Sequence, residues 1–217
     1  MVDWTKIDTV LLDMDGTLLD LHFDNYFWLD YLPVKYAAHH GGDIENASRV
    51  LTELSDSLQG TLDWYCIDYW SERLQMDIEA LKLDLLHMIK FRPGTPEFLR
   101  FLATLGKRTM LVTTAHPKTL NLTLQASGLG THLAQHVSSH DLRLAKENAG
   151  FWPRLQQLHQ LDLARCLFID DSLSVLRRAR DEGVGHTVQV LQPDMSQPPR
   201  APSEFPGLLH FDELMHA

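Results

Sequence analysis

The segment of residues 10–17 constrains the fold of this chain more than any other. It reads Val-Leu-Leu-Asp-Met-Asp-Gly-Thr, an apolar run that ends in two carboxylates. Strand residues two apart point to the same side. A buried strand here therefore places Asp13 and Asp15 together at its carboxyl end, where open α/β sheets collect ligands and catalytic groups. Crowded carboxylates repel each other unless a cation or a proton relieves them. The motif predicts a divalent metal ion or one protonated acid; the alternative is an ordinary acidic turn.

Short apolar runs and helical patterns alternate through the second half of the chain. The runs at residues 109–112, 166–169 and 186–190 have the pattern of buried parallel strands. Helical patterns precede them at residues 96–105, 153–161 and 174–182. Gly106 and Gly183 stand where a helix C-terminal cap favours glycine. This alternation predicts an α/β fold, a parallel sheet with helices on both faces.

Residues 21–89 interrupt the alternation, because they read as several helices with no strand between them. Turns are expected at 39–42 and 60–61, and Asp77 is the expected N-cap of a helix that runs to Ile89. We therefore expect an all-helical cap domain, residues 21–89, inserted into a core domain of residues 1–20 and 90–217. Near the C-terminus, a proline-rich irregular segment at 192–206 and a short helix at 212–216 are expected.

The charge balance limits the classes of partner. With 29 acidic against 19 basic residues, the net charge is -10, which argues against a nucleic-acid-binding surface. Any phosphate must then be captured by local positive groups. No apolar run approaches the length of a membrane span, and the N-terminus is polar rather than signal-like. Cys66 and Cys166 have no metal-site spacing and are expected as reduced thiols. These features predict a cytoplasmic protein, and we expect a monomer.

Further polar residues follow the later apolar runs or lie in the loops between them. Thr113 and Thr114 end one run just before a helix, Asp170 and Asp171 end another, and Lys146 lies in a loop between the two. A hydroxyl beside a helix N-terminus can bind phosphate. Each residue also has an ordinary explanation: a strand threonine, a solvated lysine, or carboxylates that favour a helix N-terminus. Their shared position, at strand ends or in loops that lead from a strand to a helix, favours a single site for phosphate and metal.

The order of these motifs resembles the haloacid dehalogenase superfamily of phosphatases, in particular the members with a helical cap inserted after the first motif. The resemblance covers nearly the whole chain. Within the superfamily the chain is similar to bacterial GMP/IMP nucleotidases, and residues 21–28, 64–72 and 113–117 carry this similarity. The chain departs from that pattern at Thr114, where an Asn is expected. A side-chain amide therefore has no role at this position, whereas a backbone N–H keeps one.

The resemblance implies which residues carry the catalysis. Asp13 is the expected nucleophile, which attacks phosphorus and forms an aspartyl-phosphate. Asp15 is the expected general acid for the leaving oxygen and then the base for water. Thr113, Thr114 and Lys146 are expected to bind and position the phosphoryl oxygens.

The resemblance also implies Mg2+ as the cofactor. Its expected ligands are Asp13, the backbone carbonyl of Asp15 and Asp171, with Asp170 as a water-mediated ligand or a neighbour of the ligands. The charges agree with this division of roles. Four carboxylates and a phosphomonoester dianion face only Lys146 and one divalent cation, so a proton on Asp15 reduces the imbalance and is the proton that the leaving group needs.

The cap is expected to recognise the substrate, a small phosphomonoester. It holds all five tyrosines of the chain, and a ring such as Tyr69 can stack on a purine, although most aromatic stripes only pack helices together. His22, Asn25 and Asp68 are the expected polar contacts to the base. Asp68 can accept the N1–H of guanine or hypoxanthine, a donor that adenine lacks. GMP and IMP are therefore the expected substrates.

Other functions remain open on the sequence alone. One is a phosphatase for sugar phosphates or other small phosphomonoesters, another is a sugar-phosphate mutase, and a third is a non-catalytic phosphate-binding protein on the same fold. The presence of both Asp13 and Lys146 argues against the last, because a degenerate site loses such residues first. Fold alone does not decide among them.

Overall fold

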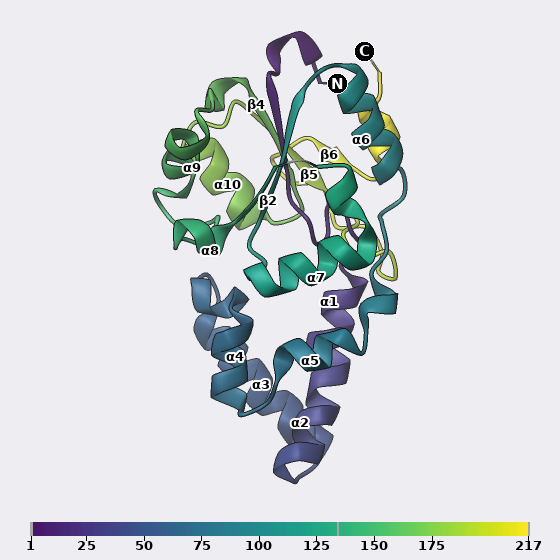
Figure 1. Ribbon diagram of the computed structural model, residues 1–217, viewed down its shortest axis with the longest axis vertical. Coiled ribbons are helices and arrows are strands. Elements are labelled where there is room, and N and C mark those ends of the chain that lie inside the picture. Colours follow the sequence, from purple (N-terminus) through teal and green to yellow (C-terminus); the bar gives the residue numbers. More distant parts are fainter. Residues whose placement is uncertain (1, 134, 217) are drawn as a thin grey trace.

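A six-stranded parallel β-sheet forms the centre of the computed structural model, which describes residues 2–133 and 135–216 (Figure 1). Its strand order is β3-β2-β1-β4-β5-β6. The strands are β1 (Thr9–Leu12), β2 (Arg108–Thr113), β3 (His136–Ser138), β4 (Cys166–Asp170), β5 (His186–Val190) and β6 (Gly207–Leu208). After the central strand β1, the chain adds β2 and β3 toward one edge of the sheet and then β4, β5 and β6 toward the other. Open α/β sheets bind ligands in the crevice at the carboxyl ends of the strands where the order reverses in this way.

Helices cover both faces of the sheet, as the sequence predicts (Figure 1). The helices are α6 (Thr95–Thr104) and α7 (Pro117–Ser127) on one face, and α8 (Ser139–Leu142), α9 (Phe151–His159) and α10 (Leu173–Asp181) on the other. Side chains alternate between the faces along each strand. Val10 and Leu12 pack with side chains of α6, whereas Leu11 packs with those of α9 and α10. All of β1 is buried for this reason, and the predicted α/β fold is confirmed.

The predicted strands and helices of the core coincide closely with the observed ones. Gly106 and Gly183 have positive φ angles of 64° and 98°, the conformation that ends a helix without strain only at glycine. The sequence missed β3 and β6, which have three and two residues and lie at the edges of the sheet. Runs this short carry too little pattern to distinguish a strand from a loop.

Two of the predicted helices are wrong in extent. The helix expected to run from Asp77 to Ile89 is α5 (Ile78–Leu83), followed by a separate 3-10 turn at Leu86–Met88. Asp77 does cap α5, because its carboxylate accepts the Ala80 N–H at 2.9 Å. The helix expected at 212–216 is a 3-10 turn at Phe211–Leu214.

Residues 22–88, which we call the cap, form a separate helical layer beyond α7 (Figure 1). Its helices are α1 (His22–Tyr26), α2 (Leu32–His40), α3 (Ile44–Leu58), α4 (Ile67–Leu74) and α5, with a π-helical turn at Phe27–Tyr31 between α1 and α2. The cap has its own hydrophobic cluster, which includes Phe23, Phe27, Leu51 and Trp70. The boundaries at residues 20/21 and 89/90 stay a prediction. Within the described residues, every helix is too short or too polar to cross a membrane.

Two antiparallel segments connect the cap to the core. Leu19 pairs with Phe91, and Asp20 N–H donates to the Lys90 carbonyl at 2.9 Å. The neighbouring Arg92 is 1% exposed. Its guanidinium donates to the carbonyls of Thr17, Gln192 and Leu209 at 2.9–3.1 Å. Burial lowers the pKa of Arg92 to about 10, against the attraction of nearby carboxylates, so the side chain stays charged at neutral pH and holds the connection against the C-terminal segment.

We predict that Arg92→Met lowers the free energy of unfolding by about 3 kcal/mol, because the apolar stem is kept while buried carbonyls lose their donors. Urea unfolding measures this change. The matched control is Arg100→Met, which removes an exposed arginine of α6 that forms an ion pair with Glu97, and should change the unfolding free energy little. Equal effects of the two substitutions would contradict the role of Arg92.

Candidate active site

Asp13 and Asp15 lie at the carboxyl end of β1, as the strand pattern predicts. Asp13 is buried, and its backbone N–H donates to the Ile169 carbonyl at 3.1 Å, which extends the pairing of β1 with β4. The chain then turns through Gly16 with a φ of +82°. A β-carbon at this position would lie 3.0 Å from the carboxyl carbon of Asp171. Glycine therefore allows both the turn and the close approach of the two acidic segments.

The ammonium group of Lys146 lies at the centre of the site. It donates to Asp13 at 2.5 Å, to Asp170 at 2.7 Å and to the Val112 carbonyl at 3.2 Å. Burial alone would lower the pKa of Lys146, but the attraction of the two carboxylates outweighs burial and raises it. Lys146 is therefore charged, and it joins the ends of β1, β2 and β4.

Three carboxylates gather around this cation. Oxygen atoms of Asp13, Asp170 and Asp171 lie within 4.8 Å of one another. Burial, with the neighbouring carboxylates, raises the pKa of Asp13 to about 7 against the attraction of Lys146. The same causes raise the pKa of Asp171 to about 6 against the attraction of Arg200. One lysine does not balance three buried acids, so this cluster can accept a further cation.

The acidic residues differ in how many of their oxygens are already engaged. Asp170 accepts from Lys146 through one oxygen and from the Ser172 N–H through the other. Asp171 accepts from Arg200 at 3.1 Å through one oxygen. Carboxylate oxygens are the donors that hard divalent cations prefer. Asp13 and Asp171 are therefore the side chains best able to hold a metal ion here.

Asp15 faces the cavity beside this cluster. Burial raises the pKa of its carboxyl well above the usual value, and the charges of Asp24 and Asp13 raise it further. These effects favour a proton on Asp15. The motif thus combines both ways of relieving crowded carboxylates, a cation near Asp13 and a proton on Asp15.

A cavity of about 730 Å³ lies between the acidic cluster and the cap. Its core wall includes Asp13, Asp15, Thr114, Lys146, Asp170, Asp171 and Arg200. Its cap wall includes the aromatic side chains Trp28, Trp64, Tyr65 and Trp70. Cavities of this size with apolar walls and a few convergent polar groups are typical of small-molecule sites.

The cap wall also contains an ion pair that the sequence did not single out. The Lys82 ammonium donates to Asp24 at 2.6 Å, and both residues line the cavity. Lys82 is 3% exposed, with its ammonium 4.7–5.6 Å from the ring centres of Phe23, Phe27 and Trp28. In the sequence Lys82 looks like an ordinary surface lysine, because only the packing of α5 onto α1 turns it inward.

The structure brings some of the predicted substrate-binding residues into the cavity wall. Thr114 and Asn25 line the cavity, and Asn25 also donates to Asp194 at 2.8 Å. Thr113 is buried at the end of β2 and lies behind the wall; its hydroxyl accepts the Ala115 N–H at 3.0 Å. Thr113 therefore shapes the loop that carries Thr114.

His22, Asp68 and Tyr69 lie outside the described residues that line the cavity. His22 Nδ1 lies 3.3 Å from the Ser196 hydroxyl. The Asp68 carboxylate is half-exposed and accepts from Lys118 at 2.7 Å. The aromatic position in the wall belongs to Tyr65 instead of Tyr69, because Tyr65 precedes α4 and extends toward the core. Its hydroxyl donates to Glu147 at 2.9 Å.

Arg200 is a cavity residue that sequence reasoning missed. It lies in the proline-rich segment, which is irregular as predicted. Its guanidinium donates to the Asp171 carboxylate at 3.1 Å and to the Asp171 carbonyl at 2.9 Å. No pattern in residues 192–206 signals this contact, since it depends on how the segment crosses the ends of the strands.

Comparison with known proteins places this site in a family. The sequence pattern of haloacid dehalogenase-like hydrolases matches residues 7–177. The chain is 37% identical over 214 residues to the GMP/IMP nucleotidase YrfG of Escherichia coli K12, which covers 99% of this chain and 96% of the relative. The Shigella flexneri protein of the same name matches equally well.

Solved structures show the same fold. A HAD phosphatase from Thermococcus onnurineus superposes with a TM-score of 0.79 at 20% identity, over 96% of both chains. A HAD family hydrolase from Deinococcus radiodurans, with bound phosphate and sodium, gives a TM-score of 0.64 at 19% identity over 96% of this chain and 93% of that one. The expected superfamily and enzyme class, a HAD-type phosphatase, are thereby confirmed. The chain belongs to the haloacid dehalogenase-like hydrolase family.

Proposed function

We propose that this protein hydrolyses phosphomonoesters with Mg2+, through an aspartyl-phosphate on Asp13, and that its substrates are purine nucleoside monophosphates. The observation that carries the proposal is the buried contact of Asp13 with Lys146 at 2.5 Å, beside Asp170 and Asp171 and facing the cavity between core and cap. A carboxylate in this position can attack phosphorus while the ammonium offsets the charge of the phosphoryl oxygens. The proposed location is the cytoplasm, in keeping with two free thiols.

Asp13 and Asp15 divide the two halves of the reaction between them. Asp13 supplies the nucleophilic oxygen, and Lys146 keeps it oriented through the 2.5 Å contact. Asp15, whose pKa burial raises, gives its proton to the leaving oxygen and then accepts a proton from the water that hydrolyses the acyl phosphate. The alcohol is released first and inorganic phosphate second.

Mg2+ fits the donor set described above. Asp13, Asp171 and the backbone carbonyl of Asp15 would hold it, with Asp170 fixed behind them by Lys146 and Ser172. When bound, the ion supplies positive charge that offsets the phosphoryl oxygens and balances the acidic cluster. Arg200 orients Asp171 from the other side.

The cap wall supports a purine substrate. The E. coli relative is named for GMP and IMP, and Trp28, Trp64 and Tyr65 offer rings on which a base can stack. Lys82 and Asp24 form the polar pair in this wall. A 6-oxopurine presents an O6 acceptor next to an N1–H donor, which matches an ammonium beside a carboxylate. Adenine presents an amino donor next to a bare nitrogen, which is the reverse pattern.

We predict that Asp13→Asn lowers kcat on the order of 10⁴-fold or more, since an amide is nearly isosteric with the carboxylate but does not attack phosphorus. Phosphate release with Mg2+ measures the loss, and a circular dichroism melt checks that the variant folds. Asp63→Asn, at an exposed cap residue, is the matched control and should keep full activity. Substantial Mg2+-dependent turnover by Asp13→Asn would contradict the assignment of the nucleophile.

For Asp15→Asn we expect a loss that depends on the leaving group. A nucleoside monophosphate needs protonation of its leaving oxygen, so kcat should fall about 10²–10⁴-fold. With p-nitrophenyl phosphate, whose leaving group needs little protonation, the first step should lose far less. Single-turnover measurements with both substrates isolate that step. Equal losses for the two substrates would remove Asp15 from the role of general acid.

The substrate proposal is tested by kcat/KM for GMP, IMP, AMP, UMP and a set of sugar phosphates. GMP and IMP should be preferred, and Lys82→Met should lower the GMP-to-AMP ratio about 10- to 100-fold, as for the loss of a charged hydrogen bond. The ratio is independent of how much enzyme remains folded. Asp68→Asn tests the alternative that Asp68 reads the base. A ratio that changes in Asp68→Asn and not in Lys82→Met would reverse the assignment, and a preference for sugar phosphates would overturn the nucleotidase proposal.

A further inference from the structure

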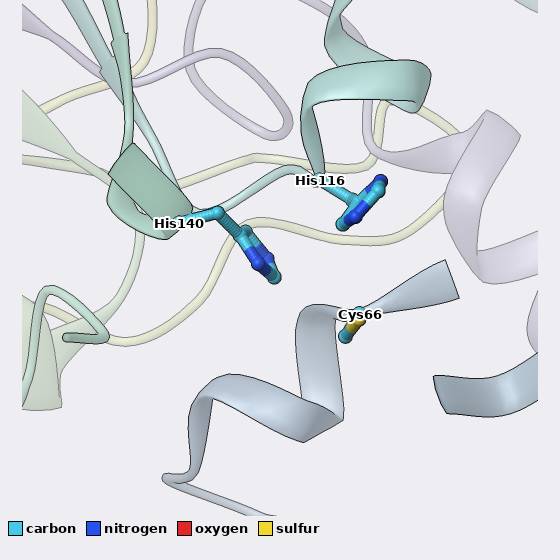
Figure 2. Close-up of side chains that lie close together, drawn as sticks. All are labelled: Cys66, His116 and His140. Carbon is cyan, nitrogen blue, oxygen red and sulfur yellow. The ribbon is translucent and has the colours of Figure 1, made fainter. Parts of the chain in front are cut away.

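A second group of metal-binding side chains lies where the cap meets the core. Cys66 is the residue just before α4 in the cap, His116 is the residue just before α7, and His140 lies in α8. The Cys66 sulfur and one ring nitrogen of each histidine lie within 4.8 Å of one another. Figure 2 shows the three side chains converging from these separate segments. The chain folding thus builds a Cys-His-His cluster that no sequence spacing signals.

The donor set selects a different kind of metal from the acidic cluster. A thiolate and two imidazoles suit Zn2+ and other borderline or soft ions, whereas Mg2+ prefers oxygen. Zinc bonds of about 2.0–2.3 Å place ligand atoms within about 4 Å of one another. Side-chain rotations that move the ligand atoms by about 1 Å would bring them from within 4.8 Å of one another to this zinc-binding separation. A three-ligand site of this type leaves one position for water.

The ring nitrogens of this cluster are poorly engaged. The Nε2 atom of His140 is buried and has no hydrogen-bond partner within residues 2–133 and 135–216. Leaving a buried polar atom unpaired is costly. His116 Nδ1 accepts only a long 3.4 Å bond from the Lys118 N–H, and His116 Nε2 lies 3.7 Å from the Asp68 carboxylate. Carboxylates of this kind orient metal-bound histidines. The T-shaped packing of the two rings, at 4.9 Å between centroids, explains their contact and leaves the unpaired nitrogen unexplained.

The protonation states agree with a ligand role. Burial lowers the pKa of both His116 and His140, and the charge of His116 lowers the pKa of His140 further, while the Asp68 carboxylate partly opposes the shift at His116. Neutral imidazoles keep a free lone pair at neutral pH. Cys66 must release its thiol proton on binding, so affinity should rise with pH.

We propose that Cys66, His116 and His140 bind Zn2+, and that the bound ion ties the cap to the core and slows turnover. Cys66 belongs to the cap and both histidines to the core. His116 also lines the cavity, as Thr114 does, so the ion would sit beside the wall of the cavity. Metal binding does not depend on the proposed function; only its inhibitory effect does.

Spectroscopy with Co2+ tests the site without measuring activity. Adding Co2+ to the full-length protein in excess Mg2+ should give visible bands of tetrahedral Co2+ and a near-ultraviolet thiolate charge-transfer band. Cys66→Ser should abolish the charge-transfer band, and His140→Gln should weaken binding at least about tenfold. Cys166→Ala, at the other free cysteine, is the matched control and should keep both features. Melting curves confirm that each variant folds. Absence of the thiolate band in the parent protein, or its persistence in Cys66→Ser, would overturn the site.

Inhibition by Zn2+ tests whether the bound ion slows turnover. Zn2+ should inhibit phosphate release by the parent, and a chelator should reverse this inhibition. Cys66→Ser and His140→Gln should keep their basal Mg2+-dependent activity while the inhibitory Zn2+ concentration rises at least about tenfold. Zn2+ acting at the acidic cluster instead would compete with Mg2+ and inhibit these variants as strongly as the parent, which would refute the coupling between cap and core. If the parent shows no Mg2+-dependent turnover before Zn2+ is added, that result would count against the proposed function and not against the Co2+ result.

Discussion

The charge of Lys146 is the constraint on which the rest of the site depends. Its ammonium is buried among Asp13, Asp170 and the Val112 carbonyl, at the ends of the three central strands. Burial alone would lower the pKa of Lys146, and the attraction of Lys146 lowers the pKa of Asp13. Each group therefore requires the others. The parallel pairing of β1 with β2 and β4 brings them to one point, so the sheet itself supplies the electrostatic arrangement.

The charges in this cluster do not balance, because the one ammonium group of Lys146 faces several carboxyl groups. Burial and the neighbouring carboxylates raise the pKa of Asp13 to about 7 and that of Asp171 to about 6. A divalent cation would return both groups to their charged forms, and a nucleophilic carboxylate must be charged. Asp15 differs from Asp13 and Asp171, because burial and the charge of Asp24 favour the protonated form of its carboxyl group. The separation of the two protonation states is the pattern expected of a nucleophile and an acid that share one site.

The sequence predicted the parts of the fold and site that are encoded locally. Apolar runs marked the four longest strands, and Asp13, Asp15 and Asp170 followed from their position at strand ends, whereas Lys146 was singled out in a loop between two predicted strands. It did not predict Lys82 or Arg200, because a lysine on a helix and an arginine in an irregular segment acquire their partners only through tertiary packing.

Helix α4 of the cap shows the same limit of prediction from sequence. Helical spacing predicts which residues share a face, but it does not say which face turns to the cavity. Tyr65 lines the cavity from the turn before α4, whereas Asp68, on the first turn of α4, accepts a hydrogen bond from Lys118 of α7 and is not among the described residues that line the cavity. The cap could therefore be recognised as an aromatic helical insert while its contact residues could not be assigned in advance.

The contacts between cap and core differ in whether they can persist while the cap opens. Arg92 anchors the connecting segments to the C-terminal part of the core, and these bonds need not change when the cap moves. The bonds from Tyr65 to Glu147 and from Lys118 to Asp68 span the seam instead. The cap wall of the cavity can move away from the core wall only when such seam contacts separate. The bond from Lys118 to Asp68 is exposed, and exposed ion pairs of this kind contribute little to stability, so it can separate easily. A thiolate and two imidazoles in the same seam add a contact whose strength depends on metal supply, so the rate of opening becomes sensitive to an ion that the acidic cluster itself does not select.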